Sequence, residues 1–436
     1  MDITLFPRLL KGTVQAPSSK SVAHRALILA ALADEPTTVG CTSTSQDIDA
    51  TAGCLNALGA TISYEEGQGF SVAPLPRAED GSPLPVRDAT LWCGESGSTL
   101  RFMMPLVAAL GGGALLQGAP RLLERPLSPL DAQLTAHGAT CELTSEGVAV
   151  SGQMSGGTFR LPGDVSSQFV SGLLLAASAL KEPVAIQVEE PVASVPYIDL
   201  TCDGLAAFGS DVALTTSLEQ EGALYTLYQA DPFVPHLAEP HYQVEGDWSG
   251  AAFWLAAGAL GSQVAVQGLS PTSDQGDRAV LGALALLGSR ITRNSASVKA
   301  EADAPQGHDL SMEQIPDLVP PVAAVAALCP GATRLCGLSR LRIKESDRIE
   351  TVRAGLSALG ASVSVEGDDL VICGVEALSG GVVDAANDHR IAMMAAIAAT
   401  RATAPVTIRG AQCVAKSYPA FFESYRALGG SLEVRP

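Results

Sequence analysis

Hydrophobic and polar residues along this 436-residue chain repeat one pattern six times: the last turn of an amphipathic helix, a glycine, and then an alternating strand. The first copy reads LNALGATIS in residues 55–63, and the last reads YRALGGSLE in residues 425–433. Each glycine suits the left-handed conformation that often ends a helix. The six glycines are Gly59, Gly138, Gly209, Gly288, Gly360 and Gly429, spaced by 79, 71, 79, 72 and 69 residues. This spacing predicts six similar supersecondary repeats in one chain.

A second regularity lies upstream of these glycines, where a strand-like run, a polar loop and an apolar helix follow one another. The six helix openings start near residues 16, 94, 163, 246, 314 and 386, and Ser, Gly, Asp and Asn are frequent in their first turns. Such residues favour helix N-caps, and a helix start presents N–H groups and a positive dipole to an anion. One opening alone is an ordinary cap. Six in the same place of a repeat, several with Lys or Arg, predict a shared anion-binding surface.

The alternation of strands with helices of moderate length predicts a mixed α/β (α+β) class. Six repeats of about 70 residues pack naturally as two groups of three. A Pro-rich segment, residues 229–243, is predicted to link the third and fourth repeats. A second one, residues 73–88, is predicted to form an exposed loop.

Composition narrows the choice of partners. The net charge of -19 makes nucleic acid and acidic membrane surfaces poor partners, so neither is expected. The nine cysteines show no CxxC or Cys/His pattern, which argues against a disulfide framework and a structural zinc site and favours a reducing compartment. No apolar stretch suits a signal peptide or a membrane span, so a soluble cytoplasmic protein is expected. Lys20, Lys344 and Lys416 lie in polar segments at predicted helix starts, where they can bind a small, multiply negative ligand.

Several motifs place hydrogen-bond donors close together. The segment SKSVAHR puts Lys20 and Ser21 in the first turn of a helix and Arg25 on the same face. In ESGSTLR, Gly97 allows the backbone to approach a ligand closely. In LLERPLSPL, Arg125 precedes a proline that suits the first position of a helix. The remaining polar groups are Ser166, Ser167 and Gln168 in SSQ, Lys344, Glu345 and Arg348 in RIKESDR, His389 and Arg390 in NDHR, and Lys416 in AKSYP.

In this order, the motifs resemble the family of 5-enolpyruvylshikimate-3-phosphate synthases, also called 3-phosphoshikimate 1-carboxyvinyltransferases. The resemblance covers essentially the whole chain, and RIKESDR together with NDHR is its most specific part. It implies two globular domains, each of three βαβαββ units in the enolpyruvyl transferase fold, with the active site in the cleft between them. The implied upper domain spans residues 15–239, and the implied lower domain combines residues 1–14 with residues 240–436.

The resemblance also implies a reaction. The carboxyvinyl group of phosphoenolpyruvate moves to the 5-hydroxyl of shikimate 3-phosphate, and phosphate leaves through a tetrahedral intermediate. This is a step of the shikimate pathway to chorismate and the aromatic amino acids, and glyphosate is its expected inhibitor. No metal ion or other cofactor is expected, and the protein is expected to be a monomer.

The residue roles that the resemblance implies fall into three groups. The shikimate 3-phosphate ligands are Lys20, Ser21, Arg25, Ser166, Ser167, Gln168, Ser194, Tyr197, Asp317 and Lys344. The phosphoenolpyruvate ligands are Lys20, Gly97, Arg125, Gln168, Arg348, Arg390 and Lys416. Guanidinium forks and ammonium groups suit the phosphate and carboxylate of that substrate. The addition also needs a base for the hydroxyl and an acid for the methylene carbon. Asp317 is expected to be the base and Glu345 the acid, with Lys20 assisting proton transfer.

Three positions depart from the family pattern, namely His24, Glu95 and Arg340. Two alternatives stay open at this point. One is the sister enzyme that transfers the same group to UDP-N-acetylglucosamine, and the other is a non-catalytic protein that binds phosphorylated metabolites. Asp317 and Glu345 favour an enzyme, because anion binding alone gives no reason for two carboxylates in a basic cleft.

Overall fold

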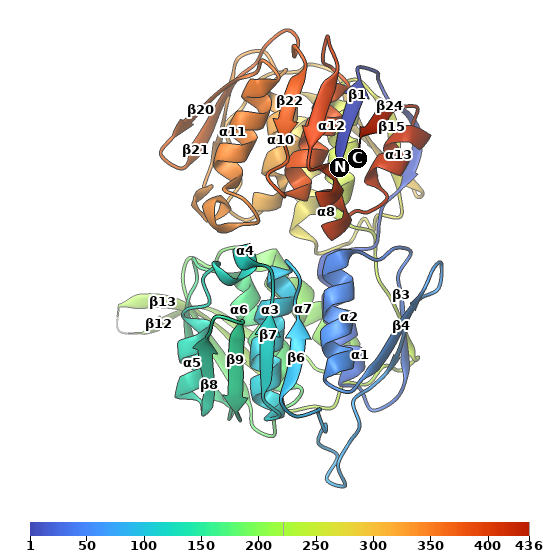
Figure 1. The fold of residues 1–436 in the computed structure, drawn as a ribbon. Coiled ribbons are helices and arrows are strands. Elements are labelled where there is room, and N and C mark those ends of the chain that lie inside the picture. Colours follow the sequence, from blue (N-terminus) through green and yellow to red (C-terminus); the bar gives the residue numbers. More distant parts are fainter. Residues whose placement is uncertain (221, 436) are drawn as a thin grey trace. The chain divides into compact units, whose positions relative to one another are not determined.

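The computed structural model describes residues 1–220 and 222–435. Strands and helices alternate along the chain, and the described strands form six four-stranded sheets (Figure 1). The expected mixed class and sixfold repeat are confirmed.

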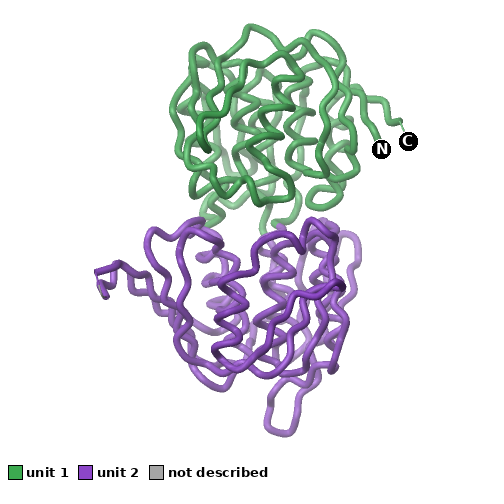
Figure 2. The backbone as a smooth tube through the Cα atoms, turned by 60° about the vertical axis from the view of Figure 1, so that its left-hand side comes forward, with its two compact units in different colours: residues 1–19, 245–436 green, residues 20–244 purple. Residues whose placement is uncertain are grey.

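Two compact units divide the chain. Unit 1 combines Met1–Ser19 with Glu245–Pro436, and unit 2 is Lys20–Val244 (Figure 2). The chain therefore leaves one unit for the other after Ser19 and after Val244. The resemblance placed these two boundaries after residues 14 and 239. Each unit contains three of the sheets and a hydrophobic core of its own.

Unit 2 contains repeats one to three. Its helices are α1 (Lys20–Ala31), α2 (Gln46–Ala57), α3 (Gly97–Leu110), α4 (Pro120–Leu123), α5 (Leu130–Ala136), α6 (Ser167–Ala177) and α7 (Val195–Ala207). Its strands are β3 (Thr37–Gly40), β4 (Thr61–Glu65), β5 (Gly69–Ala73), β6 (Ala89–Trp92), β7 (Ala114–Gln117), β8 (Ala139–Leu143), β9 (Val148–Gly152), β10 (Gly157–Pro162), β11 (Val184–Glu189), β12 (Ala213–Gln220), β13 (Ala223–Ala230) and β14 (His241–Gln243).

Unit 1 contains repeats four to six. Its α-helices are α8 (Trp248–Ala259), α9 (Val280–Leu286), α10 (Val319–Ala326), α11 (Arg348–Ala358), α12 (His389–Ala399) and α13 (Phe421–Ala427). Its short 3-10 helices are η1 (Gly276–Ala279), η2 (Pro316–Leu318), η3 (Ser339–Ile343) and η4 (Ala411–Lys416). Its strands are β1 (Asp2–Phe6), β2 (Lys11–Gln15), β15 (Gln263–Gln267), β16 (Ser289–Arg293), β17 (Ser297–Ala302), β18 (Leu310–Ser311), β19 (Ala332–Cys336), β20 (Ser362–Glu366), β21 (Asp369–Cys373), β22 (Gly381–Asp384), β23 (Val406–Arg409) and β24 (Ser431–Arg435).

Three strands join sheets that are distant in the sequence. Strand β2 pairs in parallel with β15 of the fourth repeat, and β14 pairs in parallel with β3 of the first repeat. Strand β1 lies between β23 and β24 in the sixth sheet. The predicted linker, residues 229–243, is therefore only partly a linker. Its first two residues end β13 and its last three form β14, because their backbone groups complete the sheet that starts with β3.

The predicted helix–glycine–strand junctions are confirmed. All six glycines have positive φ angles between 86° and 111°. At Gly288 a Cβ atom would also collide with the carbonyl oxygen of Ala304. The repeated glycine is therefore needed for the left-handed backbone conformation at the end of each helix.

The first helix of each repeat lies in the core of its unit. Every residue of α8, α10 and α12 is buried, and α3 and α6 are buried along nearly their whole length. A helix that is apolar on all sides needs such an environment. Its polar residues are then confined to its ends. None of the helices in the described ranges has the length and apolar character needed to cross a membrane.

Candidate active site

Side-chain caps hold several of the predicted helix starts, although α10 has none. Among the described first helices, four have one: Ser96 before α3, Ser166 before α6, Asp247 before α8 and Asp388 before α12. Each side-chain oxygen accepts a backbone N–H from the first turn of its helix. These caps keep the remaining polar residues of the helix starts in fixed positions.

In unit 2, Lys20 is the first residue of α1 and forms an ion pair with α2. Its Nζ lies 2.7 Å from Oδ2 of Asp47, and the two side chains are 17% and 10% exposed. Asp47 was not predicted from the sequence. Because an ammonium on a four-carbon chain is otherwise mobile, this pair fixes the charge of Lys20 at the helix start.

Arg25 joins three helices of unit 2. Its Nε donates to Thr201 Oγ1 at 2.7 Å, and its Nη2 donates to Ser171 Oγ at 3.3 Å and to the Tyr197 carbonyl oxygen at 2.6 Å. Its Nη1 donates to the Ser21 carbonyl oxygen at 2.6 Å. Burial lowers the pKa of Arg25 to about 10, so the guanidinium stays charged at neutral pH. Four of its five N–H groups thus bind protein oxygens.

The departure at His24 is explained by packing. His24 is buried, and its Nδ1 lies 2.7 Å from Thr51 Oγ1 on α2. Burial, together with Lys20 and Arg25, holds the pKa of His24 well below its usual value. The neutral ring also lies edge-on to Phe102 of α3. His24 therefore supports the packing of α1 against α2 and α3.

The first turns of α3 and α6 are bonded through Gln168. Its Oε1 accepts from Arg101 Nη1 at 2.6 Å, and its Nε2 donates to Ser98 Oγ at 2.9 Å. Ser166 caps α6, and Ser167 is buried in the first turn. The SSQ motif therefore sits at a helix start, as predicted, and its glutamine is already engaged with α3.

Gly97 and Arg125 are neighbours. A Cβ atom at Gly97 would lie 2.6 Å from Arg125 Nη1, so a side chain there would displace the guanidinium. Arg125 is buried, and its Nε has no hydrogen-bond partner in the described chain. The predicted helical position of Pro126 is wrong, because Arg125 and Pro126 lie in the turn between α4 and α5. Pro120 and Pro129 occupy the starts of these helices instead.

Ser194 and Tyr197 lie at the start of α7. Ser194 has a left-handed backbone with a φ of 56°, which costs a residue other than glycine roughly 1 kcal/mol or more. Tyr197 is one turn further on, and its carbonyl oxygen accepts from Arg25, as described above. Strained residues of this kind are concentrated at functional sites.

In unit 1, Arg348 lies at the centre of three carboxylates. Its Nη1 donates to Asp317 Oδ1, its Nη2 to Glu345 Oε2 and its Nε to Asp388 Oδ2, each at 2.7 Å. The side chain of Arg348 is only 1% exposed. Burial by itself lowers the pKa of Arg348, but Asp388, Glu345 and Asp317 outweigh it and raise the pKa above its ordinary value. A buried arginine thus ties together the two predicted catalytic carboxylates.

A second arginine binds the other side of Asp317. Arg390 Nη2 donates to Asp317 Oδ2 at 2.9 Å, and Arg390 Nη1 donates to the Asp317 carbonyl oxygen at 3.3 Å. Lys344 Nζ lies 3.8 Å from Asp317 Oδ1. Burial by itself raises the pKa of Asp317, but Arg390, Lys344 and Arg348 outweigh it and hold that pKa well below its usual range. Asp317 is therefore ionised and held from three directions.

Three further predicted or departing positions are Lys416, Arg340 and Glu95. Lys416 ends η4, is buried and donates to the Asn387 carbonyl oxygen at 2.5 Å. Arg340 Nη2 donates to the Glu313 carbonyl oxygen, which anchors η3. Glu95 is half-buried in the loop before α3.

This arrangement combines two chemical abilities. Asp317 and Glu345 are separate carboxylates that both bind the guanidinium of Arg348. Lys344 and Arg390 supply positive charge beside them. Paired carboxylates among buried cations suit proton transfer to and from a bound anion.

Comparisons with known proteins identify the family. A profile of EPSP synthase (3-phosphoshikimate 1-carboxyvinyltransferase) matches residues 7–425. The chain belongs to the EPSP synthase family. The expectation from the motifs is thereby confirmed, and the chain is an enzyme, a transferase of this family.

Relatives and solved structures agree along the whole chain. The 3-phosphoshikimate 1-carboxyvinyltransferase of Clostridium kluyveri is 37% identical over 99% of this chain and 98% of its own length. That of Halobacterium salinarum strain R1 is 36% identical over 99% of this chain and 100% of its own. A solved EPSP synthase from Acinetobacter baumannii superposes with a TM-score of 0.79 at 25% identity and full coverage of both chains.

Four residues of this EPSP synthase family member were missed by the sequence analysis. Asp47, Asp388 and Ser249 each contact a predicted site residue, and Asp277 is bonded to Ser249. Asp47 and Asp388 look like ordinary acids at helix starts, where acids are common for electrostatic reasons. Ser249 lies in GDWSG and Asp277 in QGDR. The bond between Arg390 and Ser249, and that between Ser249 and Asp277, arise only in the fold. The signal that could have found Asp388 is its place in NDHR, directly before the helix that Arg390 enters.

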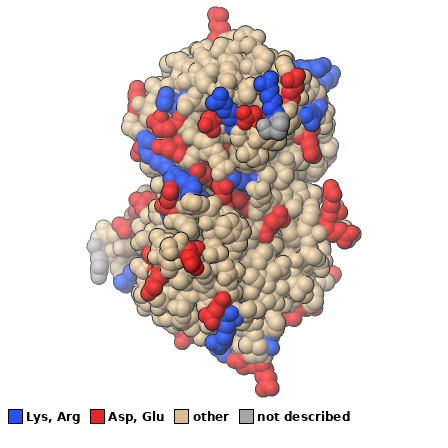
Figure 3. Space-filling view, in the orientation of Figure 1, with Lys and Arg blue, Asp and Glu red and all other residues tan. Residues whose placement is uncertain are grey.

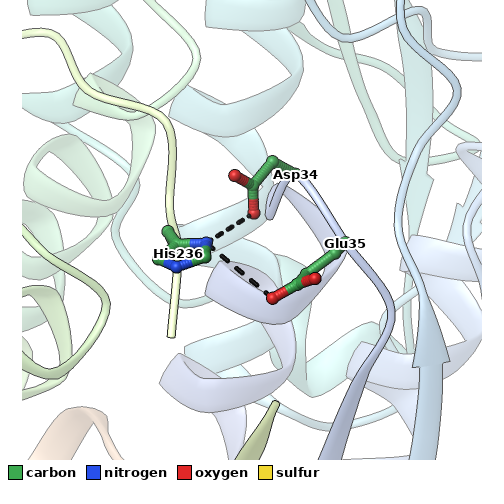
Figure 4. A group of neighbouring side chains, drawn as sticks. All are labelled: Asp34, Glu35 and His236. Atoms are coloured by element: carbon green, nitrogen blue, oxygen red, sulfur yellow. Dashed lines mark hydrogen bonds and ion pairs between the residues drawn. The ribbon is translucent and has the colours of Figure 1, made fainter. Parts of the chain in front are cut away.

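Charges elsewhere on the surface are mixed. On the face drawn in Figure 3, Lys and Arg lie among Asp and Glu. One exposed group joins the end of α1 to the segment before β14: His236 Nδ1 lies 3.0 Å from Asp34 Oδ1 and 3.9 Å from Glu35 Oε1 (Figure 4). The hydrogen bond to Asp34 raises the pKa of His236. An ion pair between the imidazole and the two carboxylates explains why these three side chains lie together.

Proposed function

We propose that the polar residues around Lys20 and Arg25 in unit 2 and those around Arg348 and Arg390 in unit 1 bind phosphoenolpyruvate and shikimate 3-phosphate. We propose that they carry out the reaction after which the family is named. In that reaction the carboxyvinyl group of phosphoenolpyruvate moves to the 5-hydroxyl of shikimate 3-phosphate and phosphate is released, a step of the shikimate pathway. The observation that carries this proposal is the bonding of Asp317 and Glu345 to one buried arginine, with Lys344 and Arg390 alongside.

The proposal divides the binding residues by substrate. Shikimate 3-phosphate is assigned to Lys20, Ser21, Arg25, Ser166, Ser167, Gln168, Ser194, Tyr197, Asp317 and Lys344. Phosphoenolpyruvate is assigned to Lys20, Gly97, Arg125, Gln168, Arg348, Arg390 and Lys416. The buried, unpartnered Nε of Arg125 beside Gly97 supports an anion contact there, because a buried charged donor gains most from a bonded anion.

Asp317 is proposed as the base and Glu345 as the acid. Three cations hold the pKa of Asp317 low, which makes it a weak base before substrate binds. A substrate anion bound to Lys344 and Arg390 would compensate part of their charge. The pKa of Asp317 would then rise toward the value that proton transfer from a hydroxyl needs.

Glu345 then protonates the methylene carbon, and the 5-hydroxyl oxygen bonds to the adjacent carbon as its proton passes to Asp317. In the second step the methyl group returns a proton to Glu345 and the carbon–oxygen bond to phosphate breaks. Arg348 contacts both carboxylates, so it stabilises whichever of them carries the negative charge.

The setting proposed for this activity is the cytoplasm, with the protein acting as a monomer. All nine cysteines are free thiols, which supports a reducing compartment.

A phosphate-release assay with a matrix of substrates tests the proposal. We expect release when phosphoenolpyruvate and shikimate 3-phosphate are both present, and background release with either alone. UDP-N-acetylglucosamine in place of shikimate 3-phosphate serves as the competing acceptor. Release with that acceptor and not with shikimate 3-phosphate would overturn the assignment.

A further inference from the structure

A buried carboxyl group of unit 1 is connected to the proposed base, Asp317, through Ser249 and Arg390. Asp277 lies in η1 and is 3% exposed. The Ser249 hydroxyl, in the first turn of α8, donates to Asp277 Oδ2. The same hydroxyl oxygen accepts from Arg390 Nη2 at 3.3 Å, and that nitrogen also donates to Asp317 Oδ2 at 2.9 Å.

The direction of these hydrogen bonds is fixed by the chemistry of the groups. A guanidinium only donates, so Ser249 must accept from Arg390. The single hydroxyl proton of Ser249 is then available for the Asp277 carboxylate. Arg390 is consequently held between two acids, with Asp317 in direct contact and Asp277 behind one serine.

Charged groups on three neighbouring elements act on Asp277. Asp317 faces it from η2, Asp247 from the start of α8 and Arg390 from α12. On its own segment, Arg278 donates to the Pro271 carbonyl oxygen. Burial and the charge of Asp317 raise the pKa of Asp277 to about 6, although Arg390 and the Ser249 hydrogen bond act in the opposite direction.

We propose that Asp277 is a positioning residue for phosphoenolpyruvate: it holds Arg390 through Ser249 until the substrate anion binds, and it then takes up a proton. The inference rests on the proposed function, which assigns Arg390 to phosphoenolpyruvate. An anion on Arg390 competes with Asp277 for the same positive charge. Its arrival also adds negative charge near a buried carboxylate, which favours the neutral acid.

The sign of the pH dependence follows by linkage. If the complex prefers protonated Asp277, binding weakens as pH rises through the range in which free Asp277 ionises. With a pKa of about 6, complete protonation in the complex would weaken binding about 50-fold between pH 6 and pH 8. Partial protonation of Asp277 in the complex weakens binding less, and we expect binding of phosphoenolpyruvate to weaken at least about fivefold over this range.

The test compares KM for phosphoenolpyruvate in the wild type and in Asp277→Asn at pH 6, 7 and 8, with saturating shikimate 3-phosphate. An amide keeps the acceptor for Ser249 and removes the charge. The ratio of the two KM values cancels the ionisation of the substrate itself. We expect the wild-type KM to rise relative to the variant by at least about fivefold across this range, with kcat changing less.

The matched control is Asp274→Asn, the same change at an exposed acid of the same loop. It should leave the ratio flat. A flat ratio for Asp277→Asn, within twofold from pH 6 to pH 8, would overturn the inference. If that variant does not fold, the two wild-type KM values are compared, because the phosphates of both substrates ionise over the same range. The KM for phosphoenolpyruvate must then rise with pH relative to that for shikimate 3-phosphate, and a constant ratio would overturn the inference. Wild-type turnover at pH 7 reports separately on the proposed function.

Discussion

Replacing Arg348 by methionine should destabilise unit 1 strongly, and more at pH 7 than at pH 5. The arginine makes four hydrogen bonds to Asp317, Glu345 and Asp388 and is 1% exposed. Removing it leaves three carboxylates without their shared cation. Breaking a buried ion pair by deleting one partner typically costs about 3 to 5 kcal/mol, and we expect a loss of this size at pH 7.

The pH dependence comes from the carboxyl groups that remain. In the wild type the pKa of Asp317 is depressed, so its contribution to stability is fully present above the unfolded value of 3.8. In the variant, burial of Asp317 is opposed only by Arg390 and Lys344, so its pKa rises from the depressed wild-type value. The loss then grows as pH rises through the range in which Asp317 ionises in the variant, and it should be smaller at pH 5 than at pH 7.

The matched control is Arg353→Met on the same helix. Arg353 pairs with Glu350 at 2.8 Å with the same i, i+3 spacing as Arg348 and Glu345, but the side chains are 39% and 46% exposed. An exposed pair contributes about 0 to 1 kcal/mol, so this variant should be nearly neutral at both pH values.

Urea unfolding followed by tryptophan fluorescence measures these effects in the relevant unit. Trp248 and Trp254 are buried in unit 1, whereas Trp92 of unit 2 is already 60% exposed in the fold. The signal therefore reports mainly on unit 1. Equal losses in the Arg348 and Arg353 variants, or a larger loss at pH 5 than at pH 7 for Arg348→Met, would refute the reasoning.

Three further outcomes are expected. Asp317→Asn should lower kcat by about 100-fold while shikimate 3-phosphate still binds in calorimetry, and near-normal turnover would remove Asp317 from the chemistry. Gly97→Ala should raise KM for phosphoenolpyruvate about tenfold or more, because its Cβ displaces Arg125. The control is Gly282→Ala, because nothing lies within 4 Å of a Cβ atom there. Equal KM values for phosphoenolpyruvate in the two variants would contradict the contact between Gly97 and Arg125. Asp277→Asn should be more stable than the wild type at pH 7 by as much as about 3 kcal/mol in urea unfolding. The reason is that the pKa of Asp277 is raised from 3.8 to about 6, so the ionised carboxylate destabilises the fold increasingly as pH rises between these values. A lower stability of the variant at pH 7 would contradict this sign.

The repeat pattern was predictable because it depends on local backbone chemistry. A helix that must stop before an alternating strand needs a residue in the left-handed conformation, and glycine is the residue that takes it at least cost. Gly59 and Gly429 therefore predict the turns that follow their helices from the local sequence alone. The apolar helices were equally visible, since burial on all sides demands a continuous apolar sequence.

Other features could not be read from the sequence because they depend on distant segments. Strand β14 is only three residues long and follows prolines, so nothing local separates it from a linker. Its partner β3 supplies the ladder that orders it. Pro126 carries the same local signal as a helix-starting proline, yet Pro129 takes that role three residues later.

The candidate site shows the same division. Arg348, Arg390 and Lys416 were selected as cations suited to an anion, and the structure adds that each already binds protein oxygens. Asp47 and Asp277 were not selected, because an acid beside a predicted anion site has no local signature. Only the pairing of Asp47 with Lys20, and of Asp277 with Ser249, gives them a role.

Proton NMR of the product formed in D₂O tests the central claim most directly. If Asp317 and Glu345 exchange protons with solvent while the carboxyvinyl group moves to the 5-hydroxyl, the product carries that group on its 5-oxygen and deuterium enters the vinyl positions. Glu345→Gln should abolish the deuterium together with turnover. A 5-carboxyvinyl product without deuterium, or undiminished deuterium incorporation by Glu345→Gln, would contradict the proposed roles of these two carboxylates.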